Sequence, residues 1–130
     1  MDSFSKTLAA AVHGMRANAA RVRLAAENMA NAKTPGYQRK VPVFTEVLDR
    51  KTGAKGVKVD RVELDTSEPL RAYEPGHPLA DDEGYMTYSN VQMFVELADT
   101  QEAQRSYEAS VQSFDRARRM YSRVLDILKR

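Results

Sequence analysis

The fold is decided by residues 89–130, which read SNVQMFVELADTQEAQRSYEASVQSFDRARRMYSRVLDILKR and contain neither glycine nor proline. Ser89 and Gln92 fit the two ends of a capping box, so we expect a helix of about 40 residues, roughly 60 Å long, to begin here. Apolar side chains recur in alternating steps of four and three, the spacing of a coiled-coil seam. The seam positions, of which Thr100, Gln104 and Arg118 are not apolar, are Met93, Leu97, Thr100, Gln104, Tyr107, Val111, Phe114, Arg118, Tyr121, Leu125 and Leu128.

This helix is longer than a domain of this size can enclose, so part of its surface is expected to bind other molecules. Val124 and Ile127 lie beside the seam and widen the apolar stripe near the end of the chain. A stripe that is wider than a two-helix contact requires indicates contacts on more than one side.

A second seam lies near the start of the chain. Its positions, again in steps of four and three, are Leu8, Val12, Met15, Ala19, Val22, Ala26 and Met29. The helix that carries them is expected to end near Asn31, because Thr34-Pro35-Gly36 cannot continue a helix. We expect this helix and the last one to pair as an antiparallel coiled coil, and a pair so rich in alanine to be marginally stable alone.

The middle of the chain is rich in turns, since ten of the eleven glycine and proline residues lie between Pro35 and Gly84. Residues 57–64 alternate in the manner of a half-buried strand, after a turn at 52–56. The other strand candidates are 70–73 and 85–88, and Phe44, Val47 and Leu48 fit either a short helix or a strand. The prediction is a mainly α-helical fold with a small antiparallel β region, divided into residues 1–32, 33–88 and 89–130.

The composition disfavours several function classes. The 130 residues carry a net charge of +2, from 20 basic and 18 acidic side chains mixed along the sequence, which disfavours nucleic acid as a partner. The absence of cysteine excludes disulfides and thiolate metal sites. No apolar run approaches the roughly 20 residues that cross a bilayer, so we expect no membrane insertion. The apolar run 8–12 is too short for a signal peptide, and we expect no cleaved signal.

The strongest candidates for catalysis or metal binding are Asp81, Asp82 and Glu83, with His77 nearby. Consecutive acids before Gly84 are more typical of a turn, and no second carboxylate cluster completes a site. The sequence also lacks a phosphate-binding glycine loop, a nucleophile elbow and a paired-histidine motif. We therefore expect no enzyme and no cofactor, and the weakest alternative is a small enzyme built on Asp81, Asp82 and His77.

The stretch 26–37, AENMANAKTPGY, closely resembles the signature shared by bacterial flagellar axial proteins of the rod and hook. The residues carrying this resemblance are Asn28, Asn31, Pro35, Gly36 and Tyr37. Two further stretches, 73–91 and 102–109, narrow it to the members of the proximal rod. Their motif residues are Pro75, Gly76, His77, Pro78, Gly84, Tyr85 and Asn90. The chain departs from many relatives in the compact stretch 34–37 and in Ser110, where they carry asparagine.

The resemblance implies a structural subunit of the flagellar basal body that polymerises through its terminal helices and transmits torque for motility. It implies export by the flagellar type III apparatus without signal cleavage, and a periplasmic place in the rod. The implied partners are the rod subunits FlgB, FlgF and FlgG and the adaptor FliE. The main alternative, left open by the residues alone, is a cytoplasmic helical adaptor or secretion chaperone that holds a partner with the same amphipathic ends.

Overall fold

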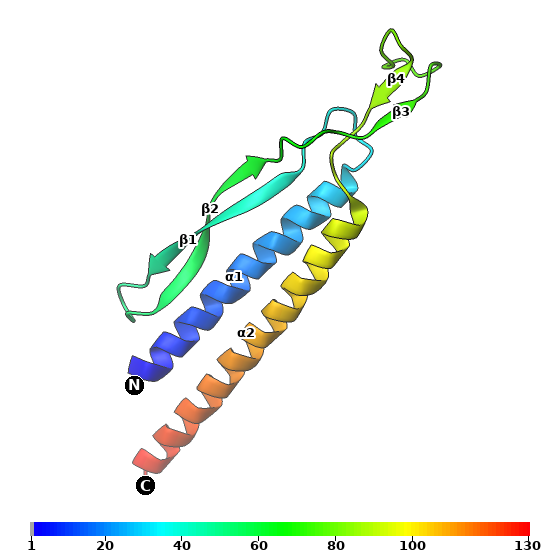
Figure 1. The fold of residues 1–130 in the computed structure, drawn as a ribbon. Coiled ribbons are helices and arrows are strands. Elements are labelled where there is room, and N and C mark those ends of the chain that lie inside the picture. The colour runs from blue at the N-terminus through cyan, green and yellow to red at the C-terminus, as the bar shows by residue number, and fades with distance from the viewer. Residues whose placement is uncertain (1) are drawn as a thin grey trace.

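A computed structural model describes residues 2–130 and confirms a mainly α-helical chain with a small β region in the middle. Helix α1, Asp2–Ala30, and helix α2, Met93–Leu128, lie side by side and run in opposite directions (Figure 1). The strands are β1, Lys40–Leu48, β2, Lys55–Leu64, β3, Arg71–Tyr73, and β4, Tyr85–Thr87. The start of α1 and the end of α2 lie at one end of an elongated molecule, and β3 and β4 lie at the other (Figure 1).

Small side chains allow the two helices to approach closely. Ala103 on α2 is fully buried, and Ala117, Ala11 and Ala25 are nearly so. A Cβ atom added to Gly14 on α1 would lie 2.7 Å from the Ser110 Oγ atom on α2, so a larger residue at position 14 would displace the Ser110 hydroxyl. Gly14 therefore compensates for its poor helix propensity by allowing a helix contact.

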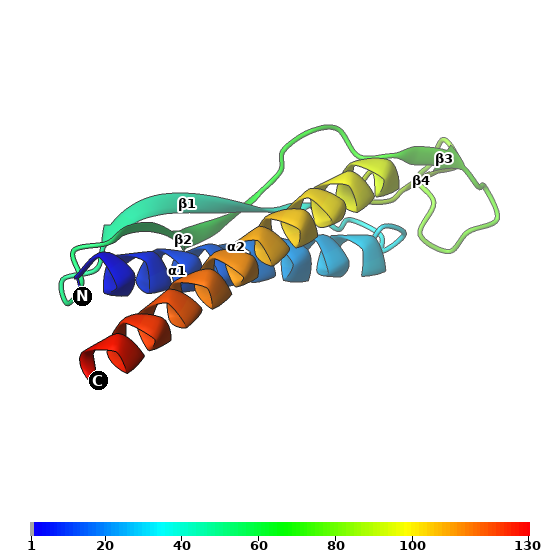
Figure 2. The same cartoon turned by 90° about the horizontal axis from the view of Figure 1, so that it is seen from below.

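The hairpin of β1 and β2 lies along the side of α1 that faces away from α2 (Figure 2). Its antiparallel register runs from Lys40 opposite Leu64 to Leu48 opposite Lys55, with an irregularity between Val43 and Phe44. Gly56 packs against the ring of His13, where a Cβ atom would come within 2.8 Å. Helix α1 is thus enclosed on two sides, by α2 and by this hairpin.

The observed β region differs from the expected one in its division. Instead of one small sheet, the strands form two separate two-stranded sheets, β1 with β2 and β3 with β4. The reason is local pairing: each sheet joins strands close in sequence, and both strands of the first pack on α1. The turn before β2 also comes earlier than expected, at residues 49–54, where the Gly53 amide donates to the Asp49 carbonyl over 2.7 Å.

The expected capping box at Ser89 is wrong. Helix α2 begins at Met93, and its N-cap Gln92 has an extended backbone and forms no side-chain capping hydrogen bond. Ser89 is buried instead, and its hydroxyl donates to the carbonyl of Ala32 just beyond α1. Its hydroxyl thus ties the two helix ends together rather than capping α2. In the described part of the chain, no helix is long and apolar enough to cross a membrane.

Candidate functional site

Several of the motif residues meet where the chain passes from α1 into β1. Asn28 is 1% exposed, and its amide forms two hydrogen bonds of 2.9 Å with the backbone of Lys40. The Tyr37 hydroxyl donates to the Asn28 Oδ1 atom over 2.9 Å. Asn31 continues the pattern one turn later, donating to the Glu27 carbonyl. These side chains fix the direction in which the chain leaves α1.

A buried ion pair lies against Asn28. Glu96, in the first turns of α2, is 1% exposed and accepts a hydrogen bond from the Arg39 Nε atom. The Asn28 amide lies 3.4 Å from its second carboxylate oxygen. Arg39 also contacts Asp99 at 3.1 Å and Asp65 at 3.6 Å. A buried charge requires this kind of pairing, because an unpaired carboxylate in such a site is strongly destabilising.

Asn90 joins the same group from the other side. Its Oδ1 atom accepts from the Arg39 backbone amide over 2.7 Å, and its amide donates to the Asp65 carbonyl over 2.8 Å. We call the connected residues the polar junction: Asn28, Tyr37, Arg39, Asp65, Asn90, Glu96 and Asp99. It links α1, the segment before β1, the segment after β2 and the start of α2.

The charges of the polar junction stabilise one another. Burial alone would lower the pKa of Arg39, but the hydrogen bond and charge of Glu96, with Asp99 and Asp65, raise it overall. The pKa of the Asp65 carboxyl is lowered, first by the hydrogen bond from the Ser67 amide and also by Arg39. Burial raises the pKa of the Tyr37 hydroxyl, as does the nearby charge of Glu27. The polar junction therefore favours the charged forms of Arg39 and Asp65.

The second group of motif residues shapes the β3–β4 hairpin. Gly84 has a φ of 87°, and a Cβ atom there would lie 2.9 Å from the Tyr73 ring, so only glycine fits. The rings of Tyr73 and Tyr85 meet edge to face at 5.3 Å, and Arg71 lies over Tyr85. The loop between them carries the remaining motif residues, Pro75, Gly76, His77 and Pro78. These residues support a hairpin that projects beyond the helices (Figure 1).

Asp81 and His77, the residues on which the enzyme alternative relies, form hydrogen bonds within this hairpin. Asp81 accepts from the backbone amides of Glu83 and Tyr85 and contacts Arg71 at 2.8 Å. The hydrogen bond from Tyr85 lowers the pKa of Asp81, and Arg71 adds to this effect. The His77 Nδ1 atom accepts from the Leu79 amide. Within residues 2–130, no group of three or more histidine, aspartate or glutamate side chains is arranged to hold a metal ion.

The predicted seam residues divide into two sets by exposure. The half-buried ones are Leu8, Val12, Met15, Val22 and Met29 on α1 and Val111, Phe114, Tyr121 and Leu125 on α2. The exposed ones are Ala19 and Ala26 on α1 and Met93, Leu97, Gln104, Tyr107, Arg118 and Leu128 on α2, whereas Thr100 is half-buried. The tightest contacts of α2 with the rest of the chain lie one position before the predicted ones, at Glu96, Ala103 and Ala117. The seam therefore borders the helix contact and leaves apolar surface uncovered.

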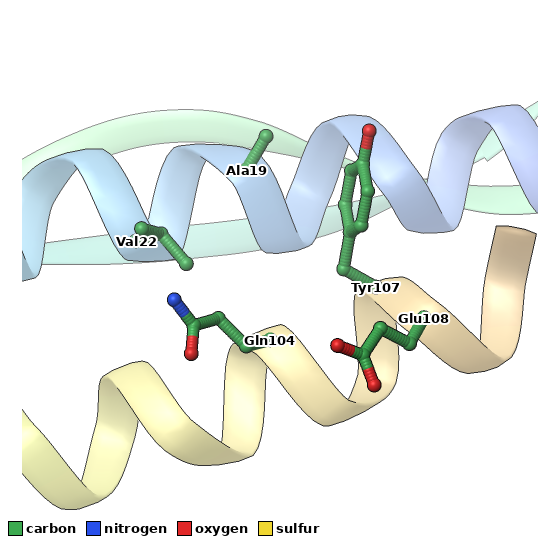
Figure 3. A pocket seen from close by; sticks show the side chains of 5 residues that line it. All are labelled: Ala19, Val22, Gln104, Tyr107 and Glu108. Atoms are coloured by element: carbon green, nitrogen blue, oxygen red, sulfur yellow. The ribbon is translucent and has the colours of Figure 1, made fainter.

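A groove of about 470 Å³ runs between the helices on the seam side. It is lined by Ala19 and Val22 of α1 and by Gln104, Tyr107 and Glu108 of α2. Figure 3 shows Val22 and Gln104 pointing toward one another, while the Tyr107 ring reaches from α2 toward α1. The two seams thus face the same side of the molecule.

Helix α2 exposes an unusual amount of apolar surface. Phe94 is 88% exposed, and Leu128 and Ile127 are 74% and 69% exposed. We call the exposed set the α2 apolar surface: Met93, Phe94, Val95, Leu97, Tyr107, Met120, Ile127 and Leu128. Met93, Phe94 and Val95 are consecutive and therefore point in widely different directions around the helix. Exposed apolar side chains in this number make α2 a candidate surface for contact with other proteins.

Sequence reasoning missed the charged members of the polar junction. Arg39, Glu96, Asp65 and Asp99 were indistinguishable from surface charges, because none follows an apolar period. One usable signal existed at Glu96, which stands among Met93, Val95 and Leu97 at the start of a helix. A lone acid among apolar neighbours indicates a buried partner of opposite charge.

Comparisons with known proteins agree on one class of relative. Residues 82–127 match the family model described as the C-terminal part of the FlgEFG proteins of the flagellar basal-body rod. A flagellar basal-body rod protein FlgC from Agrobacterium fabrum is 36% identical, over 99% of this chain and 98% of the relative. The FlgC protein of an Escherichia coli O6:H1 strain is 34% identical, over 87% of this chain and 89% of the relative. The FlgC protein of Aquifex aeolicus is 31% identical, over 99% of both chains.

Proposed function

Since the chain belongs to the FlgC family of flagellar basal-body rod proteins and is a structural subunit of the rod, we propose that it polymerises through its terminal helices in the proximal part of the rod. The observation that carries this proposal is the α2 apolar surface, which the chain itself does not cover. Each of its large side chains would contribute about 1.5 to 3 kcal/mol if fully buried by a neighbour. Contacts between unlike surfaces that do not close into a ring generate a helical assembly.

The groove beside the seams is the second surface we assign to neighbours. The groove lies on the two seams, which continue along the helices through half-buried Val12, Met15 and Val111, so a helix laid along the seams would cover apolar side chains from both α1 and α2. Many helices packed side by side in this way make a stiff tube, which is what the transmission of torque for motility requires. The partners we propose are FlgB, FlgF, FlgG and the adaptor FliE, with this chain exported unprocessed into a periplasmic rod.

A catalytic role has no support in this proposal. Asp81 and His77, the candidate catalytic residues, accept hydrogen bonds from backbone amides in the β3–β4 hairpin, and Asp81 also pairs with Arg71. The family is one of structural rod proteins. We therefore infer that the chain acts by assembly, and the cytoplasmic adaptor or secretion chaperone is not favoured.

The first experiment is extraction of hook and basal-body particles with detergent from cells that carry a tagged copy of the chain. The tag should remain with the particles through gradient purification, and it should be lost from cells that cannot build a rod. A chain found only in the cytosol would support the adaptor or chaperone instead.

The second experiment is Val111→Asp, which places a carboxylate at a half-buried seam position beside the groove. Burial of this charge by a neighbour would cost several kcal/mol, so we expect motility in soft agar to be lost. The matched control is Gln112→Asp, which adds the same charge at the next, exposed position. If cells with Val111→Asp swim normally, or if both variants are equally defective, the seam is not the assembly surface.

A further inference from the structure

We propose that the polar junction fixes the register of the α1–α2 pair, which the small side chains between the helices do not determine on their own. This inference concerns the single chain and goes beyond its role in the rod. It assigns to Arg39 and Glu96 a positioning function, to align two helices along each other. The case has three parts: an interface that tolerates sliding, a charged site that does not, and the weakness of other polar contacts.

The helix interface tolerates sliding because it is built from small residues that recur every seven positions on α2. Gly14 faces Ser110, and a nearby groove is lined by Ala11, Ala109 and Ser113. A shift of α2 by seven residues would bring Ala103 or Ala117 opposite Gly14, and both are already buried in the helix contact. The seam repeats with the same period, so the apolar pattern survives such a shift.

The polar junction has no such repeat. Glu96 is buried against Arg39 and Asn28, and the position seven residues later in α2 is Ala103. A shifted pair would separate the Glu96 carboxylate from Arg39 and leave the Asn28 Nδ2 atom with the Lys40 carbonyl as its only acceptor. Breaking a buried ion pair corresponds to a factor of about a hundred or more in the ratio of two states. Buried polar groups are known to select register in helix pairs in this way.

The other ion pair between the helices is too weak to do this, and the hydrogen bond from Ser89 to Ala32 lies next to Asn90, at the same end as the polar junction. Among the described residues, Arg21 with Glu102 is the only other ion pair that joins the two helices, at 3.7 Å. The Glu102 side chain is 70% exposed, and exposed pairs of this kind contribute little. Register selection is therefore concentrated at one end of the pair.

The test uses disulfides as position markers, because the chain contains no cysteine. A Cβ atom on residue 14 would lie 3.6 Å from the Ser110 Cβ atom, within the range that a disulfide spans. Gly14→Cys with Ser110→Cys reports the native register. Gly14→Cys with Ala103→Cys, or with Ala117→Cys, reports a shift of seven residues in either direction. Each pair is oxidised in the purified full-length chain at low protein concentration, and the bridged fraction is read from gel mobility.

In the otherwise unchanged chain, only the 14–110 pair should bridge, by about a hundredfold over the other two. In Arg39→Met with Glu96→Leu, which removes the buried carboxylate together with its cation and leaves only the more exposed Asp65 and Asp99 without Arg39, at least one shifted pair should bridge at a rate within about tenfold of the native pair. Glu96→Gln, which keeps the size of the side chain and loses its charge, should increase the bridging of the shifted pairs by a smaller factor. Arg21→Gln is the control, and in this variant 14–110 should remain the only pair that bridges.

Two results would overturn the proposal. One is a double variant in which 14–110 remains the only pair that bridges, since the small residues would then select the register themselves. The other is a loss of bridging at all three positions in both the double variant and Glu96→Gln, which would mean that the junction holds the helices together without choosing their alignment. Failure of the unchanged chain to form the 14–110 bridge would also contradict it.

Discussion

The two ends of the helix pair are built on opposite principles. At the end where the chain reverses, Asn28, Ser89 and Glu96 are each 1% exposed and every one of them has a hydrogen-bond partner. At the other end, Ile127 and Leu128 are mostly exposed, and the closest aromatic contact between the helices is Phe4 with Tyr121 at 5.9 Å. At the first end, the reversal end, buried polar groups form hydrogen bonds within the chain. At the second, the free end, apolar side chains remain exposed.

This difference indicates where order and assembly originate. A buried network confers geometric specificity on the reversal end, because each of its groups needs a particular partner. At the free end, where the helices begin and end the chain, Ile127 and Leu128 are mostly exposed, so this end is expected to open first when the chain is destabilised. Neighbouring subunits would complete that end, so its final order depends on assembly. The following predictions test the contrast.

The largest loss of stability is expected from Arg39→Met. It leaves the Glu96 carboxylate buried without its cation, at a cost of about 3 to 5 kcal/mol in the free energy of unfolding. Urea denaturation of the purified chain measures this. Glu27→Gln, which removes the more exposed ion pair with Lys40, should cause a clearly smaller change. Equal losses would show that the burial of the Arg39–Glu96 pair does not increase its contribution to stability.

The next largest is expected from Gly84→Ala in the β3–β4 hairpin. The new methyl group would lie 2.9 Å from the Tyr73 ring on a backbone with φ of 87°, costing about 1 to 3 kcal/mol. Amide hydrogen exchange should speed up at Glu74, whose N–H donates to the Gly84 carbonyl. Gly76→Ala is the matched control, because no atom lies within 4 Å of its Cβ position. Similar exchange in both variants would contradict the steric argument.

A smaller effect is expected from pH. The lowered pKa of Asp65 means that the unfolded state takes up its proton first as the pH falls, so this group stabilises the fold above the unfolded pKa of about 3.9 and loses that contribution below it. Asp65→Asn should reduce the loss of unfolding free energy between about pH 5 and pH 3, measured by urea denaturation at each pH, by less than about 1 kcal/mol because the side chain is partly exposed. An unchanged slope would remove Asp65 from the charge balance of the junction.

The smallest effect on the isolated chain is expected from Ile127→Ser. Because this side chain is 69% exposed, its loss should change the free energy of unfolding by no more than about 0.5 kcal/mol. Incorporation into basal-body particles should nevertheless fall, since the apolar surface at the free end is altered. A destabilisation comparable to that of Arg39→Met would mean that the free end is already ordered by internal contacts.

The helices and strands of this fold could be predicted from local sequence patterns, but the polar junction could not. Helix α1 ends at Ala30, close to the predicted Asn31, and residues 57–64 lie in strand β2, although Val57, Val62 and Leu64 are exposed rather than half-buried. The seam positions were set by apolar period alone, whereas the close helix contact depends on the size of Ala103 and Ala117, which carry no strong signal. Arg39 and Glu96 lie far apart in sequence, and only the folded chain brings them together. The capping box predicted at Ser89 was wrong because the Ser89 hydroxyl bonds to the Ala32 carbonyl instead of to the start of α2.

The β1–β2 hairpin has a consequence for how copies of the chain meet. A two-stranded ladder has two open margins whose backbone groups could recruit a strand from another molecule. Here Pro42 removes one backbone donor from β1, and β2 carries the charged, exposed residues Lys58, Asp60, Arg61 and Glu63. Both features discourage amyloid-like stacking. Copies of the chain can thus be crowded without pairing strand to strand, which is compatible with the helix contacts proposed above.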